Sequence, residues 1–460
     1  MMIRQIQAQC KFCQQLEMPA LQQVIAPETL RRVLTQCGQK TRRQRKLNLE
    51  VVMWLLIAMN LFSDLSMGRV LEKVAYGLRL LWPPSEDVLA GESALTYRRY
   101  QLGVRPMVAL FRQVCKPMAT PETPGAFRFG LRLMALDGHV TNLPDTPENA
   151  AYFGRSGTDR GQSAWPQVKG VYLSECGTHA VVDVGFWPYN TSEHLGAKRL
   201  LRSVEEGMLV MWDRGLHSYD LIEATLARGA QFLGRLPANV KPLLLKRLSD
   251  GSWLVRLLPS EPKRRAQHEG VIVRLIVYTI TDAARSGYAQ THRVITSLLC
   301  AELFPGEELA CTYHERWEEE ILFDEIETHQ QAPDTLLRSR KPVGVLQELY
   351  ALVVAHYAVR FLMHEAAQKA HLDPDRISFT RALHLIDLAT TPFALMAPEE
   401  IACYYERLLE DLARKPLPAR RLRAFPRVVK RKMSTFALKR PEREPPPRRL
   451  KPFQEAVLLI

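Results

Sequence analysis

Two short stretches of the chain decide its fold: Leu131-Arg-Leu-Met-Ala-Leu-Asp137-Gly-His139 and Met208-Leu-Val-Met-Trp-Asp213-Arg-Gly215. Each is an apolar run of strand length that ends at an aspartate. Helical patterns near 192–203 and 219–227 separate such runs, so strands alternate with helices as in an α/β sheet. Because reactive groups gather at the carboxyl ends of strands in such sheets, we expect Asp137 and Asp213 to lie close together.

The pattern along the chain predicts four regions. The spacing of apolar residues predicts a helical domain over residues 1–116, and the prolines between 117 and 124 indicate a linker. Residues 126–236 and 300–372 predict one α/β domain, interrupted over 237–299 by an all-β insertion with a hairpin turn at Asp250-Gly251. Residues 373–460 predict a helical region followed by a basic tail.

The positive charge of the chain is concentrated near its C-terminus. The formal net charge is +13, and residues 414–451 contain fifteen Lys and Arg against two Glu, so the remainder is balanced. Apolar residues interleaved with these charges favour a segment that binds a polyanion such as DNA, with a solvated solubilising tail as the alternative. A second basic cluster, at Lys40, Arg42 and Arg43, precedes the apolar stretch 51–62.

Neither export nor a membrane is indicated by the composition. The N-terminus lacks the pattern of a signal peptide, and the longest apolar stretch, 51–62, is too short to cross a bilayer. The eight cysteines are scattered, and the single close pair, Cys10 and Cys13, is weak support for zinc, so ordinary reduced thiols are expected. We therefore expect a cytoplasmic protein with no membrane partner.

A third acidic candidate lies in the segment Tyr313-His-Glu-Arg-Trp-Glu-Glu-Glu320. On a helix, spacings of three and four place Tyr313, Arg316 and Glu320 on one face, with Glu327 seven residues further on. Three converging carboxylates would supply the hard oxygen ligands that Mg²⁺ requires. Each aspartate taken alone is also compatible with a turn or cap role, and a charged surface helix would also be rich in glutamate.

This register resembles the Y-x-x-R-x-x-x-E signature of insertion-sequence-four family transposases, members of the DDE superfamily. Asp137-Gly138 and Asp213-Arg214-Gly215 are similar to the family's two aspartate motifs. Also typical are three further segments, Leu337-Arg338-Ser339, Gln347-Glu348 and the basic run 426–432. The resemblance implies an α/β, RNase H-like catalytic core interrupted by an all-β insertion, with an N-terminal helical DNA-binding domain and a helical and basic C-terminal region.

The implied activity is DNA transposition in the bacterial cytoplasm, at the nucleoid. The enzyme would cleave transposon ends and join them to target DNA by a cut-and-paste route with a hairpin intermediate. Asp137, Asp213 and Glu320 would be both catalytic and metal-binding, holding two Mg²⁺ ions that Mn²⁺ can replace. The implied partners are double-stranded DNA with terminal inverted repeats, target DNA, and a second copy of the chain in a homodimeric synaptic complex.

The same resemblance, with the basic clusters, predicts the residues that contact DNA. Arg316 and Tyr313 would bind phosphate, although a salt bridge from Arg316 to Glu319 or Glu320 is the alternative. A hairpin requires a flipped base, for which Trp253 is favoured as a stacking partner over Trp165 and Trp317. The full set of predicted DNA-binding residues is Tyr313, Arg316, Lys40, Arg42, Arg43, Arg427, Lys430, Arg431, Lys432 and Trp253.

Two positions depart from the family pattern. Glu327 stands where the family has a lysine expected to contact DNA phosphate, and His139 stands where a small hydroxyl residue commonly follows Asp-Gly. A carboxylate at 327 is expected to face the DNA backbone and repel it. These departures keep open a catalytically silent DNA-binding protein derived from a transposase. A different RNase H-like nuclease, acting on branched DNA, is a further alternative.

Overall fold

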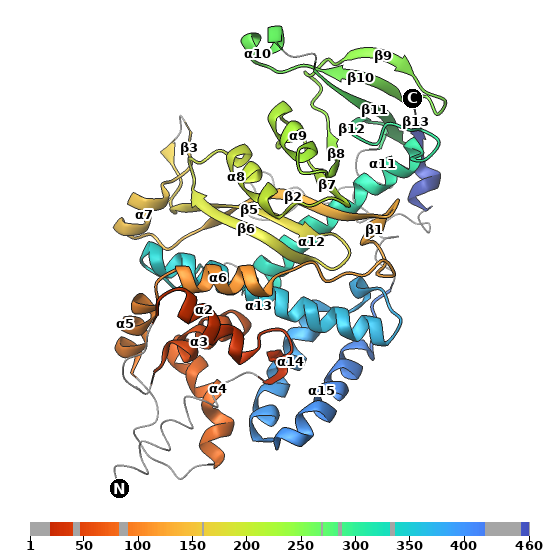
Figure 1. Ribbon diagram of the computed structural model, residues 1–460. Coiled ribbons are helices and arrows are strands. Elements are labelled where there is room, and N and C mark those ends of the chain that lie inside the picture. The colour runs from red at the N-terminus through yellow and green to blue at the C-terminus, as the bar shows by residue number, and fades with distance from the viewer. Residues whose placement is uncertain are drawn as a thin grey trace.

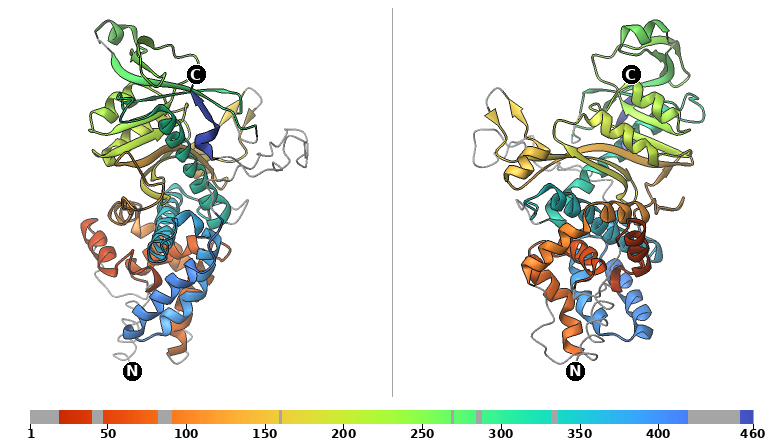
Figure 2. Two further views of the ribbon diagram at one scale, coloured as in Figure 1. Left: turned by 90° about the vertical axis from the view of Figure 1, so that its right-hand side faces the viewer. Right: turned by 60° about the vertical axis from the view of Figure 1, so that its left-hand side comes forward.

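The computed structural model describes residues 19–39, 47–81, 91–158, 161–267, 270–283, 288–331, 336–418 and 452–459. The molecule is elongated, with most of its helices at one end, a large sheet in the middle and a strand-rich tip at the other end (Figure 1). Two further views show the same separation of helices from strands (Figure 2). The mixed α/β class predicted from the sequence is confirmed.

The first part of the described chain is helical, as the sequence predicts. α3 is apolar on all sides and almost wholly buried, which is the pattern of a core helix. The side chain of Asn48 caps this helix by accepting a hydrogen bond from the Val51 amide at 2.8 Å. The elements are η1 (Pro19–Leu21), α2 (Pro27–Gln36), α3 (Leu49–Leu61), α4 (Met67–Leu81), α5 (Glu92–Leu102) and α6 (Arg105–Val114).

Five strands form one side of the sheet, which begins at the edge strand β6, in the order β6-β5-β2-β7-β8. β5 and β6 continue from β2 as antiparallel neighbours, whereas β7 and β8 run parallel to β2. This order fits the RNase H-like core that the sequence predicts. The strands are β2 (Leu131–Asn142), β5 (Gln167–Glu175), β6 (Ala180–Pro188), β7 (Met208–Trp212) and β8 (Gln231–Arg235).

Helices cover both faces of these strands. α8 and α9 pack on one face in a core with Trp212 and Phe232, and α13 packs on the other face through a second core that includes Val181 and Val184. The smaller elements here are β1 (Phe127–Arg128), α7 (Pro147–Phe153), β3 (Gly157–Thr158), β4 (Gly161–Gln162), α8 (Glu193–Leu200), η2 (Leu201–Ser203) and α9 (Tyr219–Leu226).

The strands between 237 and 299 extend this same sheet, because β12 pairs with β8 and is followed by β11, β10 and β9. Asp250-Gly251 makes the predicted turn between β9 and β10, with Gly251 at φ +85°. The segment is not all β, since Pro262 begins a short helix between β10 and β11. The elements are β9 (Leu243–Arg247), β10 (Trp253–Leu257), α10 (Pro262–Gln267), β11 (Val271–Ile280) and β12 (Thr291–Thr296).

One continuous helix is predicted near 308–329, but the structure shows four consecutive helical pieces. A 3-10 turn and a π-helix flank α12, so the backbone hydrogen-bond pattern changes three times from α11 to η4. The pieces are α11 (Gly306–His314), η3 (Glu315–Trp317), α12 (Glu318–Asp324) and η4 (Glu325–Gln330).

The C-terminal helices share one core with the N-terminal helices, because α13 packs on α3 and α6, and α14 packs on α4. α13 is long and apolar enough to cross a membrane, but 78% of its most apolar window is buried inside the protein. After the basic segment, the chain returns to pair β13 with β11, a strand that the sequence did not predict. These elements are α13 (Pro342–Lys369), η5 (Pro374–Arg376), α14 (Phe379–Leu395), α15 (Pro398–Ala413), η7 (Phe453–Ala456) and β13 (Val457–Leu459).

Candidate active site

Asp137 and Asp213 extend from neighbouring parallel strands. Leu136 on β2 is paired with Trp212 on β7, so the two aspartates occupy the next position on each strand. Asp213 directly follows the end of β7, as predicted. Asp137 instead lies within β2, because β5 remains paired with β2 as far as Asn142. The expectation that the first strand ends at Asp137 is therefore wrong, but the strand pairing brings both aspartates to the same level of the sheet.

Arg316 connects the first aspartate to the broken helix. Its Nη1 lies 3.1 Å from Oδ2 of Asp137, and its Nη2 lies 3.8 Å from Oε1 of Glu320. The salt bridge to Glu320 is the alternative that the sequence left open for Arg316. The guanidinium therefore links Asp137 on β2 with Glu320 on α12, and Asp213 stands beside Asp137 on β7.

The three carboxylates act on one another electrostatically. The pKa of Asp137 is raised to about 6, first by burial and then by the negative charges of Asp213 and Glu320, against the opposing effects of Arg316 and the Gly138 amide. The Gly215 and Leu216 amides donate to Oδ1 of Asp213 at 2.7 and 3.2 Å, which orients that carboxylate. A cluster of mutually repelling hard oxygen atoms fits a divalent cation, which would relieve the repulsion.

Three acids close to Glu320 in the broken helix have partners of their own. Glu319 is buried against the Ser174 hydroxyl, and burial raises its pKa well above the usual range. Glu318 lies 2.7 Å from His179, and Asp324 lies 3.4 Å from His329. Glu320 is the acid of α12 that shares Arg316 with Asp137.

Tyr313 is buried beneath this cluster. Its hydroxyl donates to the Trp212 carbonyl at 3.4 Å, next to Asp213, and its ring centroid lies 5.9 Å from the Arg316 guanidinium. Burial raises the pKa of Tyr313. The tyrosine thus attaches α11 to the end of β7, and its contact with DNA phosphate stays a prediction.

The remaining DNA-contact candidates divide into two groups. Trp253 is half-buried on β10, where it packs against the sheet core and under the Arg247 guanidinium, with 5.8 Å from that group to the ring centroid. Trp165 and Trp317 are more accessible, at 41% and 43% exposed, so the structure does not single out Trp253. The other candidates lie outside the described residues: Lys40, Arg42, Arg43, Arg427, Lys430, Arg431 and Lys432.

The two positions that depart from the family pattern contact each other. Nε2 of His139 is within hydrogen-bonding range of Oε1 of Glu327. A residue on β2 thus binds the Glu327 carboxylate, and the orientation of that carboxylate toward the DNA backbone stays a prediction. Sequence spacing offered no signal for this contact, since the two residues are 188 positions apart.

A buried polar cluster behind α12 was also not foreseen. Ligand atoms of His179, Glu318 and Asp375 lie within 4.8 Å of one another, which is close enough to consider a cation. However, Arg360 Nη2 donates to Nδ1 of His179, so the neutral ring carries its proton on Nε2, which faces Glu318 at 2.7 Å. Arg360 also binds Glu325. We interpret the cluster as a hydrogen-bonded ion network that fastens the broken helix to α13.

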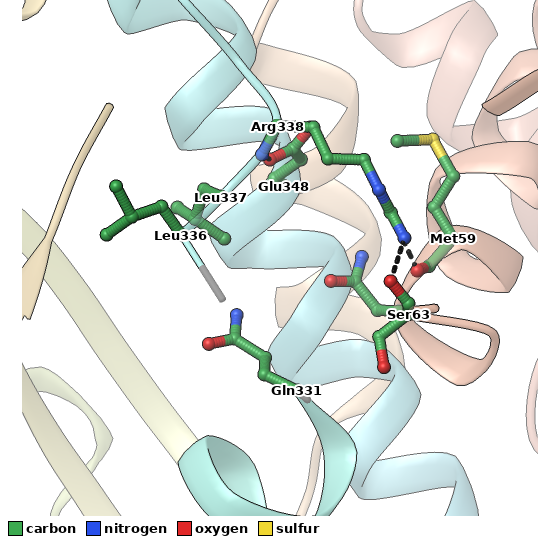
Figure 3. Close-up of a pocket in the computed structure, with 8 residues that line it drawn as sticks. Met59, Ser63, Gln331, Leu336, Leu337, Arg338 and Glu348 are labelled. Atoms are coloured by element: carbon green, nitrogen blue, oxygen red, sulfur yellow. Dashed lines mark hydrogen bonds between the residues drawn. The ribbon is translucent and has the colours of Figure 1, made fainter. Parts of the chain in front are cut away.

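The segments Leu337-Arg338-Ser339 and Gln347-Glu348 have a structural role. Figure 3 shows Arg338, from the segment before α13, beside a small pocket, and its guanidinium donates to the Met59 and Ser63 carbonyls at 2.9 and 2.6 Å. Glu348 accepts hydrogen bonds from the Arg338 amide at 2.9 Å and from Arg99 at 3.2 Å. These residues join the N-terminal helices to the helix that supports the sheet.

Comparison with known proteins agrees with this geometry. Residues 15–112 match the insertion element 4 transposase N-terminal family, and residues 128–357 match the transposase DDE domain family. The chain is similar to the transposase InsG for insertion sequence element IS4 of Escherichia coli K12, with 31% identity over 417 residues that cover 88% of this chain and 90% of InsG. It is also 29% identical to the putative transposase InsZ of the same strain over 218 residues, which cover 46% of this chain and 68% of InsZ.

A solved structure shows a looser likeness. The piggyBac transposase in a cryo-EM synaptic complex with hairpin DNA aligns with 87% of this chain and 85% of its own, at 12% identity and a TM-score of 0.43. That likeness is too loose to bear on the fold or the mechanism.

Proposed function

The chain belongs to the insertion element 4 (IS4) family of DDE transposases and is a DNA transposase, and we propose that Asp137, Asp213 and Glu320 are its catalytic carboxylates. The observation that carries this proposal is the arrangement around Arg316, which contacts Asp137 and Glu320 while Asp213 stands beside Asp137 on the next strand. The pKa of Asp137 also supports the proposal, because the charges of Asp213 and Glu320 both raise it, which requires the three carboxylates to be near one another.

The DDE domain implies that the enzyme uses divalent metal ions. We propose two Mg²⁺ ions, with Mn²⁺ as a substitute, held by the three carboxylates. When bound, such ions activate an attacking oxygen and stabilise the leaving oxygen of a phosphodiester. The donor set supports this assignment, because carboxylate oxygens are the ligands that Mg²⁺ prefers and all three residues supply them.

The other residues of the site organise these carboxylates. Arg316 holds Asp137 and Glu320 in place and would bind a phosphate of the DNA, since a guanidinium can donate to two oxygens at once. Tyr313 attaches α11 to the Trp212 carbonyl at the end of β7, and Arg316 follows Tyr313 by three residues. The amides that donate to Asp213 set the direction of its carboxylate in advance of substrate binding.

The proposed substrates are the ends of an insertion element and a target duplex. Hydrolysis at each end would free a 3′-hydroxyl, whose attack on the opposite strand gives a hairpin that is reopened before insertion. We propose that a homodimer acts on paired terminal inverted repeats in the bacterial cytoplasm, at the nucleoid. Relatedness to the IS4 transposase InsG over most of both chains supports this choice.

The test measures cleavage and binding separately. Asp137→Asn, Asp213→Asn and Glu320→Gln should each abolish cleavage of an oligonucleotide carrying the terminal repeat, in Mg²⁺ and in Mn²⁺, while keeping affinity for that DNA. Asp324→Asn is the matched control, because Asp324 is an exposed acid of the same helix that pairs with His329. Cleavage that survives in any of the three variants would remove that residue from the site. Wild-type protein that binds ends but never cuts them would reveal the catalytically silent alternative.

A further inference from the structure

His139 and Glu327 form a second connection between the strand and the helix that carry the proposed catalytic carboxylates. His139 follows Asp137 by two residues on β2, so both side chains extend from the same face of the strand. Nε2 of His139 meets Oε1 of Glu327, which lies on η4 directly after α12. The side chains are 22% and 43% exposed, so the contact lies at the edge of the site rather than in the core.

Aromatic packing fixes this contact from below. The ring of His139 lies on that of Phe323, with centroids 4.8 Å apart and an interplanar angle of 30°. Phe323 meets Tyr172 edge-to-face at 5.2 Å, and Tyr172 is the β5 partner of Asp137 in the strand register. The imidazole is therefore packed on Phe323 of α12, and turning away from Glu327 would disrupt that contact.

Glu320 lies between two connections of this kind. Four residues before it, Arg316 contacts Asp137, and seven residues after it, Glu327 contacts His139. Both partners are on β2. Regular helix geometry does not by itself fix the position of Glu320, because a 3-10 turn precedes α12 and a π-helix follows it. Other contacts, of Glu318, Glu319 and Glu325, attach the broken helix to the rest of the fold, and these two attach it to β2, the strand that carries Asp137.

We propose that His139 and Glu327 are positioning residues that hold the Glu320 helix against β2 and thereby set the spacing of the metal-binding carboxylates. This inference rests on the proposed function of those carboxylates. Loss of the contact would let Glu320 move relative to Asp137, and a cation held between them would be bound less tightly. Groups that orient metal ligands typically affect metal affinity by about 10-fold to 100-fold.

The experiment measures Mn²⁺ binding to the full-length protein by calorimetry, together with the Mn²⁺ concentration that half-activates cleavage. His139→Ala and Glu327→Ala should each weaken Mn²⁺ binding by about tenfold. The double variant should be no weaker than either single variant, because each change already removes the same contact. The exchanged variant, which combines His139→Glu with Glu327→His, should recover part of the affinity.

The matched control is His329→Ala, which removes a histidine–carboxylate pair from the same helical stretch without a partner on β2. Its Mn²⁺ affinity should equal that of the wild type. Additive losses in the double variant, or a lowered melting temperature with unchanged Mn²⁺ affinity, would overturn the positioning role. Asp137→Asn distinguishes a failure of the positioning role from a failure of the proposed carboxylate site. If Asp137→Asn abolishes Mn²⁺ binding but the His139 and Glu327 variants leave Mn²⁺ binding unchanged, only the positioning inference fails. If Asp137→Asn leaves Mn²⁺ binding intact, the proposed carboxylate site and the inference both fail.

Discussion

Removing the charge of Asp137 should stabilise the metal-free protein even though it abolishes cleavage. The side chain is 21% exposed, and burial raises its pKa from 3.8 to about 6, with Asp213 and Glu320 contributing in the same direction. Because the folded pKa lies above the unfolded value, ionised Asp137 opposes folding. The cost is absent below the unfolded pKa, grows as the pH rises, and is complete above about pH 6. A shift of this size corresponds to at most about 3 kcal/mol.

Asp137→Asn keeps the shape of the side chain and removes this cost. In the presence of a chelator, the variant should melt a few degrees above the wild type at pH 7 to 8, and the difference should shrink toward pH 4. Addition of Mn²⁺ should then raise the melting temperature of the wild type but not that of the variant, because bound metal stabilises only a protein that can hold it. Scanning calorimetry across this pH range measures both effects. A difference that does not vary with pH, or a variant that is less stable at every pH, would refute the argument.

Four further outcomes are expected. Arg316→Ala should lower single-turnover cleavage by about tenfold or more, and Arg316→Lys should recover little, since an ammonium group cannot contact two carboxylates in the same planar geometry. Glu327→Lys should weaken Mn²⁺ affinity rather than improve activity, because the lysine would remove the carboxylate that His139 contacts, and improved excision would contradict the contact. Arg360→Met should lower the melting temperature by leaving Glu325 buried without that cation, at a cost of about 3 kcal/mol. Deletion of residues 419–451 should flatten the dependence of DNA affinity on salt, and an unchanged slope in filter-binding measurements would show that this basic segment does not contact phosphate.

The sequence correctly predicts the elements that are determined by residues close together in the chain, such as apolar runs and turn residues. Hydrophobic runs bounded by Asp137 and Asp213 located two neighbouring strands, and the apolar stretch at 51–62 located a buried helix. The turn at Asp250-Gly251 followed from the residues that a hairpin needs. These patterns could not show where a strand ends when its partner continues. β2 extends past Asp137 to Asn142 because β5 remains paired with it over those residues.

The C-terminal strand is a second example of the same limit. Val457–Leu459 is only three residues long and has no period of its own. It is a strand because β11 extends beyond β10 and offers Tyr278 to Ile280 as partners, and because Ala456 accepts a hydrogen bond from the Thr281 amide at 2.8 Å. The ends of the basic region are therefore attached to the fold, through the Leu417 amide, which donates to the Arg376 carbonyl, and through β13.

The choice of Glu320 among its acidic neighbours shows how site and fold depend on each other. Helical spacing from Arg316 selects Glu320, but the same stretch contains other carboxylates that spacing alone cannot exclude. Two of them have partners distant in the chain: Ser174 lies 145 positions from Glu319, and His179 lies 139 positions from Glu318. Each of these contacts also fastens the broken helix to the sheet. Two acids that could have competed with Glu320 for a metal ion thus help to hold the broken helix in place, and no pattern within the helix could reveal that division.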